Sequence, residues 1–224
     1  KAGVTSALDM SGPGISVLEL ARGYGTGLNL ATIEYVRPGY TVSGDDPSPA
    51  ELQQLITKVQ RQGSLGIKLL GGHYPLTVAA TARAIRAAAD LGAYTAFHAG
   101  TASHGSNIEG MLEAVELADG NPLHLAHINA YCRGTVLPEA EETELALKAL
   151  AANPNISCES YLSPLNGTSA EIIDGMPGSM VTRCCLKTGG FTEDEAGMEA
   201  ALLSGWAQAN YPQGQEMTLL TGEE

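Results

Sequence analysis

The sequence is poor in aromatic and charged residues and lacks long hydrophobic runs. Aromatic residues make up 5% of its 224 residues and charged residues make up 17%. No apolar run approaches the roughly 20 residues that a transmembrane helix needs, and no signal peptide is visible in these residues. We therefore predict a cytoplasmic protein with no membrane as partner.

Cysteine and positive charge are also scarce. Twelve Lys and Arg residues against 25 Asp and Glu residues give a formal net charge of −13. This charge argues against nucleic acid as a partner, because phosphate backbones repel an acidic surface. The cysteines form no C-x-x-C pair and are predicted to be reduced thiols, as in a cytosolic protein. They are Cys132, Cys158, Cys184 and Cys185.

Short apolar runs alternate with helical patterns over most of the chain. This alternation predicts a parallel sheet with right-handed crossovers. The near-constant repeat length favours an α/β fold of the (β/α)8 TIM-barrel type over an open doubly wound sheet, since no G-x-G-x-x-G follows an early strand. Strands are predicted over residues 4–10, 28–35, 65–70, 93–99, 123–129 and 155–161.

Helices are predicted between these strands from apolar spacing and capping signals. Ser48 with Glu51 three residues later is a capping-box pattern at the start of one of them. Beyond residue 161 the pattern is weaker, and we predict a short helix over 169–173, a strand over 181–186, a helix over 192–209 and a strand over 217–220. Before residue 161, helices are predicted over 15–24, 77–91, 106–117 and 139–151, and another helix is predicted to begin at Ser48.

Three strands end in a residue that can carry chemistry, and their spacing is nearly regular. Thirty positions separate Lys68 from His98, and 29 separate His98 from His127. Each interval is about one strand-plus-helix unit, so the three side chains are expected at the C-terminal ends of successive parallel strands. The sites of barrel enzymes lie at this end. We predict that Lys68, His98 and His127 converge on a metal.

Lys68 has three interpretations. An unpaired buried ammonium costs several kcal/mol, so a lysine in an apolar strand is normally neutralised, paired or used in chemistry. It could extend to solvent at the strand end, or form a Schiff base as in barrel aldolases. It could also be carbamylated by carbon dioxide and bridge two divalent cations.

His98 and His127 would be ligands of a divalent metal, for which we expect one or two zinc ions. Imidazole is a common nitrogen ligand of Zn²⁺, and two nearby metals can activate a hydroxide for attack on a carbonyl. Mn²⁺ and Fe²⁺ suit the same donors. His124 lies three positions before His127, so on a continuous strand it would point to the opposite face, toward the helices.

Four short segments resemble the amidohydrolase superfamily, most closely its hydantoinase, dihydroorotase and N-acyl-amino-acid deacylase branch. The resemblance covers about residues 1–165 and implies a metal-dependent barrel that hydrolyses a C–N bond of a cyclic amide or N-acyl amino acid. By position, Lys68 resembles the carbamylated bridging ligand, and His98 and His127 resemble two single-histidine ligands. The segments are Gly3-Val4-Thr5-Ser6, Gly66-Ile67-Lys68, Phe97-His98-Ala99-Gly100 and Leu125-Ala126-His127-Ile128.

Two features of the family pattern have no counterpart in this sequence. The family's first strand carries an H-x-H pair and its last strand an Asp, whereas here there is no H-x-H and only Glu223 and Glu224 lie near the end. We therefore interpret residues 1–224 as a partial barrel domain, without the family's small β-sandwich domain and with residues expected before Lys1. The alternative is a catalytically silent barrel that acts as a scaffold or subunit.

Residues next to these strand ends are candidates for substrate binding. A small-molecule amide is the expected partner, and we also expect a homo-oligomer. Arg133 could hold a substrate carboxylate in a bidentate pair. The predicted substrate-binding residues are His73, Tyr74, Asn129, Arg133 and Tyr161.

Overall fold

The computed structural model describes residues 3–10, 12–160, 166–210 and 218–221. The chain divides into two compact units, Lys1–Ser160 and Tyr161–Glu224. Each unit is described by itself. Within the described residues, no helix combines the length and the hydropathy needed to cross a membrane.

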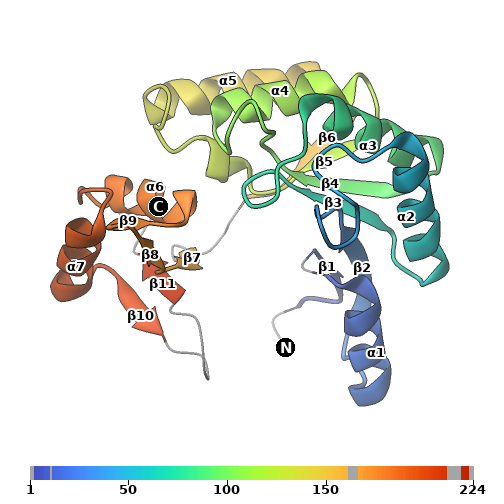
Figure 1. The fold of residues 1–224 in the computed structure, drawn as a ribbon, viewed down its shortest axis with the longest axis horizontal. Helices are drawn as coiled ribbons and strands as arrows, with labels where there is room; N and C mark the ends of the chain where they lie inside the picture. Colours follow the sequence, from blue (N-terminus) through green and yellow to red (C-terminus); the bar gives the residue numbers. More distant parts are fainter. Residues whose placement is uncertain (1–2, 11, 161–165, 211–217, 222–224) are drawn as a thin grey trace. The chain divides into compact units, whose positions relative to one another are not determined.

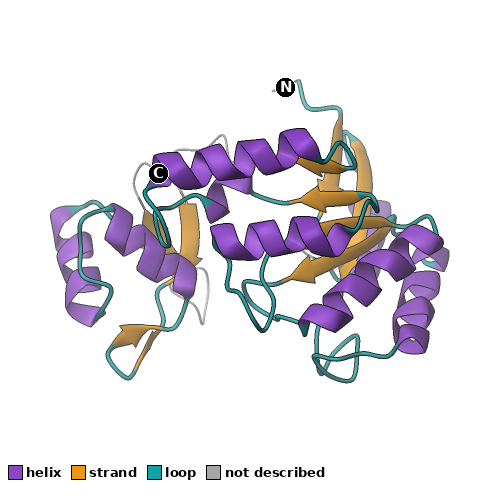
Figure 2. Ribbon diagram, turned by 90° about the horizontal axis from the view of Figure 1, so that it is seen from above, coloured by secondary structure: helices purple, strands orange, loops and turns teal. Residues whose placement is uncertain are grey.

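The first unit is a six-stranded parallel sheet in the order β1-β2-β3-β4-β5-β6, curled like part of a barrel and flanked by helices (Figures 1 and 2). The strand order confirms the predicted parallel alternation, while closure into eight strands remains a prediction. The elements are β1 (Ser6–Asp9), α1 (Gly14–Tyr24), β2 (Asn29–Tyr35), α2 (Pro49–Arg61), β3 (Gly66–Leu70), α3 (Val78–Asp90), β4 (Tyr94–His98), α4 (Ile108–Ala118), β5 (Leu123–Leu125), the 3-10 helix η1 (Ile128–Tyr131), α5 (Glu139–Ala152) and β6 (Ile156–Cys158).

The core of this unit lies between helices α2–α5 and one face of the strands. Ile67, Leu69 and Phe97 from the strands are buried there with Leu52 and Ile85 from the helices. Because successive strand residues point to opposite faces, these positions leave Lys68 and His98 on the other face. The alternation therefore decides which side of the sheet carries the candidate site.

Side-chain caps begin three of the helices described in the first unit. The hydroxyls of Ser48 and Thr77 accept hydrogen bonds from the first turns of α2 and α3. Asn107 does the same for α4, which starts two residues later than predicted. The Glu51 carboxylate bonds to Ser43, so the predicted capping box is made only on its Ser48 side.

The second unit pairs β10, β11 and β7 in an antiparallel sheet, and β8 pairs with β9. Its buried residues include Leu186, Met198 and Ala201. Its elements are β7 (Asn166–Ser169), β8 (Ile172–Ile173), β9 (Met176–Pro177), α6 (Met180–Thr188), α7 (Glu195–Ser204), β10 (Gln208–Asn210) and β11 (Thr218–Thr221).

Two of the predictions for this unit were wrong. Residues 181–186 are helical, because Thr182, Cys185 and Leu186 are all buried and their i, i+3, i+4 spacing gives a helix one apolar face. The predicted helix over 169–173 is not formed: Ser169 ends β7, residues 170–171 connect the strands, and Ile172 and Ile173 form β8, the first strand of a hairpin. Asp174 and Gly175 between β8 and β9 both have positive φ, as a two-residue hairpin turn requires.

The predicted helix over 192–209 is shorter than expected. It starts at Glu195, where Asp194 caps it, and ends at Ser204. Gly205 follows with φ 78°, a left-handed conformation that commonly terminates a helix. The chain then continues as β10.

Candidate metal centre

Lys68 is buried in β3 on the face of the sheet opposite the helices. The residue is 3% exposed, and Nζ lies 3.6 Å from Sδ of Met10. Burial lowers the pKa of Lys68 to about 8, although the Glu159 carboxylate acts to raise it. More of this amine than of a solvated lysine is therefore neutral near pH 7, and the neutral amine is the nucleophilic form.

His98 is the last residue of β4 and is enclosed on one side of its ring. Nε2 lies 2.7 Å from Oγ of Ser106, and a Cβ added to Gly72 would lie 2.8 Å from the same nitrogen. Burial lowers the pKa of His98 to about 3, helped by the nearby side chains of His127 and Lys68. The imidazole is therefore neutral at physiological pH, as a metal ligand must be.

His127 marks the point where the chain leaves the sheet. The predicted strand 123–129 ends at Leu125, and His127 has φ 59° and ψ 58°, a left-handed conformation that is uncommon for a residue with a side chain. Its ring centroid lies 5.7 Å from that of His98, in an edge-to-face arrangement. The structure thus brings together two of the predicted ligands, although His127 is on a turn and not on a strand.

His124 does not point toward the helices, as the sequence had suggested. It lies in register with Ala96 of β4 and Ser157 of β6, and it therefore shares the face of Lys68. Its Nδ1 is 2.9 Å from Oγ of Ser157. The prediction failed because it assumed a strand running unbroken from His124 to His127.

Glu159 belongs to this site and was missed by the sequence analysis. It follows β6 directly, and its Oε1 lies 2.9 Å from the backbone nitrogen of His127 and 2.9 Å from Nδ1 of the same residue. An acidic residue close after a strand was the available signal, analogous to His98 at the end of β4. Cys158, the residue before Glu159, is exposed.

The predicted substrate-binding residues of the β3–α3 loop lie beside His98. His73 is exposed, and its ring centroid is 6.3 Å from that of His98. The Tyr74 ring lies 6.4 Å from that of His73 and packs under the guanidinium of Arg37, whose Cζ is 4.3 Å from the ring centroid. This loop therefore borders the candidate site.

The other predicted substrate-binding residues follow His127. Asn129 lies in η1, and Arg133 is close enough to His98 for its charge to lower the pKa of that imidazole. Tyr131, between them, is fully buried, and its hydroxyl accepts a hydrogen bond from the backbone nitrogen of Ala99 at 2.9 Å. Tyr161 lies outside the described residues.

The donor set fits part of a site for a divalent cation. In the part of the chain that the structure describes, no three His, Cys, Asp or Glu side chains are grouped to hold a metal ion together. Two imidazoles with their pKa values lowered by burial nevertheless face each other next to a buried lysine. Such neutral nitrogen donors suit Zn²⁺.

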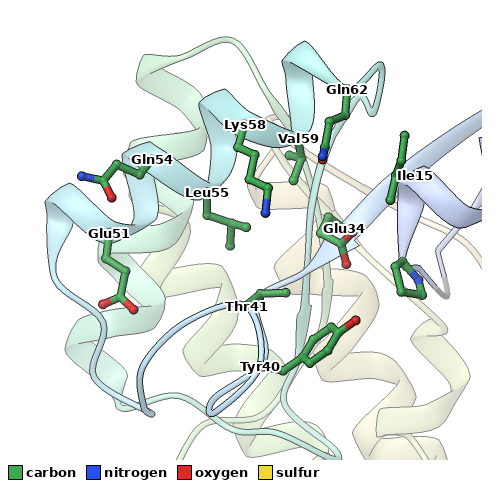
Figure 3. Close-up of a pocket in the computed structure, with 11 residues that line it drawn as sticks. Ile15, Glu34, Tyr40, Thr41, Glu51, Gln54, Leu55, Lys58, Val59 and Gln62 are labelled. Atoms are coloured by element: carbon green, nitrogen blue, oxygen red, sulfur yellow. The ribbon is translucent and has the colours of Figure 1, made fainter.

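A separate pocket of about 480 Å³ lies on the helix side of the sheet (Figure 3). Glu34 reaches it from β2 and is in register with Ile67, so it points away from the face of Lys68. Lys58 and Gln62 border it from α2. None of the predicted site residues lines this pocket, and it is distinct from the candidate metal centre.

His104, in the loop after β4, is tied to α4. Its Nδ1 lies 2.9 Å from Oε1 of Glu113, and the Thr101 hydroxyl donates to the other carboxylate oxygen at 2.6 Å. The hydrogen bond to Glu113 raises the pKa of His104 above its ordinary 6.5. Because the folded-state pKa is the higher one, this contact stabilises the fold fully below about pH 6.5 and ceases to do so as pH rises through the folded value.

We expect an NMR titration to show this directly. The pKa of His104 should lie above that of an unperturbed histidine in the wild-type protein, and it should fall in Glu113→Gln because the amide cannot stabilise the imidazolium. Glu144→Gln, on α5, serves as the control and should leave the value unchanged. Equal values in wild type and Glu113→Gln would contradict the assignment.

Comparisons with known proteins place the fold. No protein-family model and no curated protein sequence matches the chain. Solved structures do match. The formyltransferase/hydrolase complex FhcABCD from Methylorubrum extorquens, in complex with methylofuran, aligns with 98% of this chain and 43% of its own at a TM-score of 0.57 and 16% identity.

A second match is N-acyl-D-glutamate deacylase from Bordetella bronchiseptica, complexed with zinc and a phosphonate inhibitor. It aligns with 94% of this chain and 47% of its own, at a TM-score of 0.52 and 12% identity. The chain thus spans less than half the length of either protein. At these identities the likeness establishes a shared fold.

Proposed function

We propose that this chain carries part of the metal site of an amidohydrolase that cleaves the C–N bond of an amide. The observation that carries the proposal is the arrangement of Lys68, His98 and His127. Lys68 lies in the middle of β3 and not at its end as predicted, but it shares one face of the sheet with His98 at the C-terminal end of β4. The His127 ring lies edge-on to that of His98, with ring centroids 5.7 Å apart. Enzymes with barrel sheets use this end of the strands for chemistry.

Each residue has a role in this proposal. The lowered pKa of Lys68 favours the neutral amine, which can add carbon dioxide and become a carbamate that bridges two cations. His98 and His127 remain neutral and offer nitrogen lone pairs. Divalent cations bound by these groups, zinc in our proposal, would polarise the amide carbonyl and lower the pKa of a coordinated water.

The fold supports this reaction class. One structural neighbour is named as a deacylase complexed with zinc, and another is named as part of a formyltransferase/hydrolase complex. We infer a cyclic amide or an N-acyl amino acid as the substrate, the chemistry of the hydantoinase, dihydroorotase and deacylase branch. Arg133 would hold a substrate carboxylate, and His73 and Tyr74 would border the substrate from their loop.

Metal analysis of the purified protein tests the proposal. We expect bound zinc in the wild type and its loss in His98→Ala, because the imidazole at the end of β4 is removed from the site. The matched control is His104→Ala, which removes an imidazole bonded to Glu113 instead and should retain the metal. Equal metal content in both variants, or a wild type that binds no metal, would overturn the proposal and favour a catalytically silent barrel.

A further inference from the structure

We propose that Glu159 is a positioning residue that fixes the ring orientation and the tautomer of His127. This inference rests on the proposed function, because it assigns the role through a metal ligand. Oε1 of Glu159 accepts a hydrogen bond from the backbone N–H of His127 at 2.9 Å and lies 2.9 Å from Nδ1 of the same residue. One carboxylate oxygen thus contacts both the backbone and the side chain of His127.

The backbone at His127 is in a conformation that needs support. Its φ of 59° places a residue with a Cβ in the left-handed region, where the Cβ comes too close to the following carbonyl oxygen. Besides its carboxylate, Glu159 offers its carbonyl oxygen, which accepts a hydrogen bond from the backbone nitrogen of Ile128 at 2.8 Å. The end of β6 therefore holds the turn after β5 at two successive residues.

The close approach of Oε1 to Nδ1 also favours one tautomer of the His127 ring. An ionised carboxylate can only accept hydrogen bonds, so its oxygen 2.9 Å from Nδ1 of His127 favours a proton on that nitrogen. Nε2 then keeps its lone pair and is the nitrogen left to bind a metal. A carboxylate behind a ligating histidine raises the basicity of that ligand and holds its ring in place.

The alternative role for Glu159 is that its carboxylate binds the metal itself. In the described part of the chain, Glu159 does not form with His98 and His127 a group placed to hold one ion. Its carboxylate oxygen Oε1 instead lies 2.9 Å from both the backbone nitrogen and Nδ1 of His127. The experiment below separates the two roles.

The first measurement uses metal-free protein and nitrogen-15 NMR of the histidine rings. We expect His127 to be protonated at Nδ1 in the wild type and to shift toward the Nε2-protonated tautomer in Glu159→Ala. Glu159→Gln, which keeps one acceptor oxygen, should fold if the alanine variant does not and should show an intermediate distribution. Unchanged tautomers in both variants would overturn the proposal.

The second measurement is zinc titration. Glu159→Ala should bind zinc about 10- to 100-fold more weakly with unchanged stoichiometry, and Glu159→Gln should recover part of the affinity. The surface variant Glu144→Gln is the control. Loss of one equivalent of zinc with the His127 tautomer unchanged would make Glu159 a ligand and overturn the positioning role. If the wild type binds no zinc but the tautomer still shifts, the positioning role stands and the proposed function fails.

Discussion

Lys68→Met is expected to abolish amidohydrolase activity without destabilising the fold. A carbamate cannot form on methionine, so the proposed metal site would lose the ligand that we assign to Lys68. The loss of several kcal/mol of transition-state stabilisation corresponds to more than about a hundred-fold in rate. The free energy of unfolding should stay level or rise, because a buried amine is replaced by an apolar side chain of similar length. Metal content, activity and denaturant unfolding measure these effects.

The matched control for this experiment is Lys148→Met. Lys148 is 69% exposed and pairs with Glu144 on the surface of α5, so its replacement should change neither metal content nor activity. A shorter variant, Lys68→Ala, leaves room for a small carboxylic acid. Added acetate should restore part of the bound metal in Lys68→Ala and none in Lys68→Met. Full activity in Lys68→Met would refute the role of the carbamate.

Gly72→Ala is expected to weaken metal binding without replacing any of the proposed ligands. A Cβ at position 72 would lie 2.8 Å from Nε2 of His98, closer than side chains tolerate, so the imidazole must move. His98 is 8% exposed and its Nε2 contacts Ser106, which leaves the ring little space to adjust. Zinc affinity should fall by about 10- to 100-fold, the effect typical of losing ligand orientation.

Gly44→Ala provides the control for this substitution. Gly44 has open space around its Cβ position, and its backbone is not in the left-handed region. The variant should therefore bind zinc like the wild type. Isothermal titration of wild type, Gly72→Ala and Gly44→Ala with zinc measures the three affinities. Equal affinities for Gly72→Ala and wild type would show that His98 is not held against this loop.

Strands β3, β4 and β5 show where counting alternate residues predicts the direction of a side chain and where it does not. Alternation in β3 and β4 was enough to place Lys68 and His98 on one face, because both strands are continuous and buried. The same counting failed for His124, since β5 has only three residues and the chain turns at His127. A period of two holds only while the strand lasts.

In the second unit, β-strand propensity fails to predict a helix. Val181–Leu186 contains β-branched residues that favour a strand, yet it lies within α6. There the burial of Thr182, Cys185 and Leu186 on one helical face outweighs local preference. The hairpin around Asp174 and Gly175 was recognisable from its turn residues, and was overlooked because the flanking strands are only two residues long.

The amino-acid pattern alone indicates the order of six parallel strands and selects Lys68, His98 and His127 as candidate ligands. These depend on neighbours in the chain, through apolar alternation and spacing. The pairing of Glu159 with His127, the closeness of Gly72 to His98 and the lowered pKa of Lys68 depend on tertiary packing. Each joins residues from different strands or loops, and burial and distance arise only when those segments are packed together.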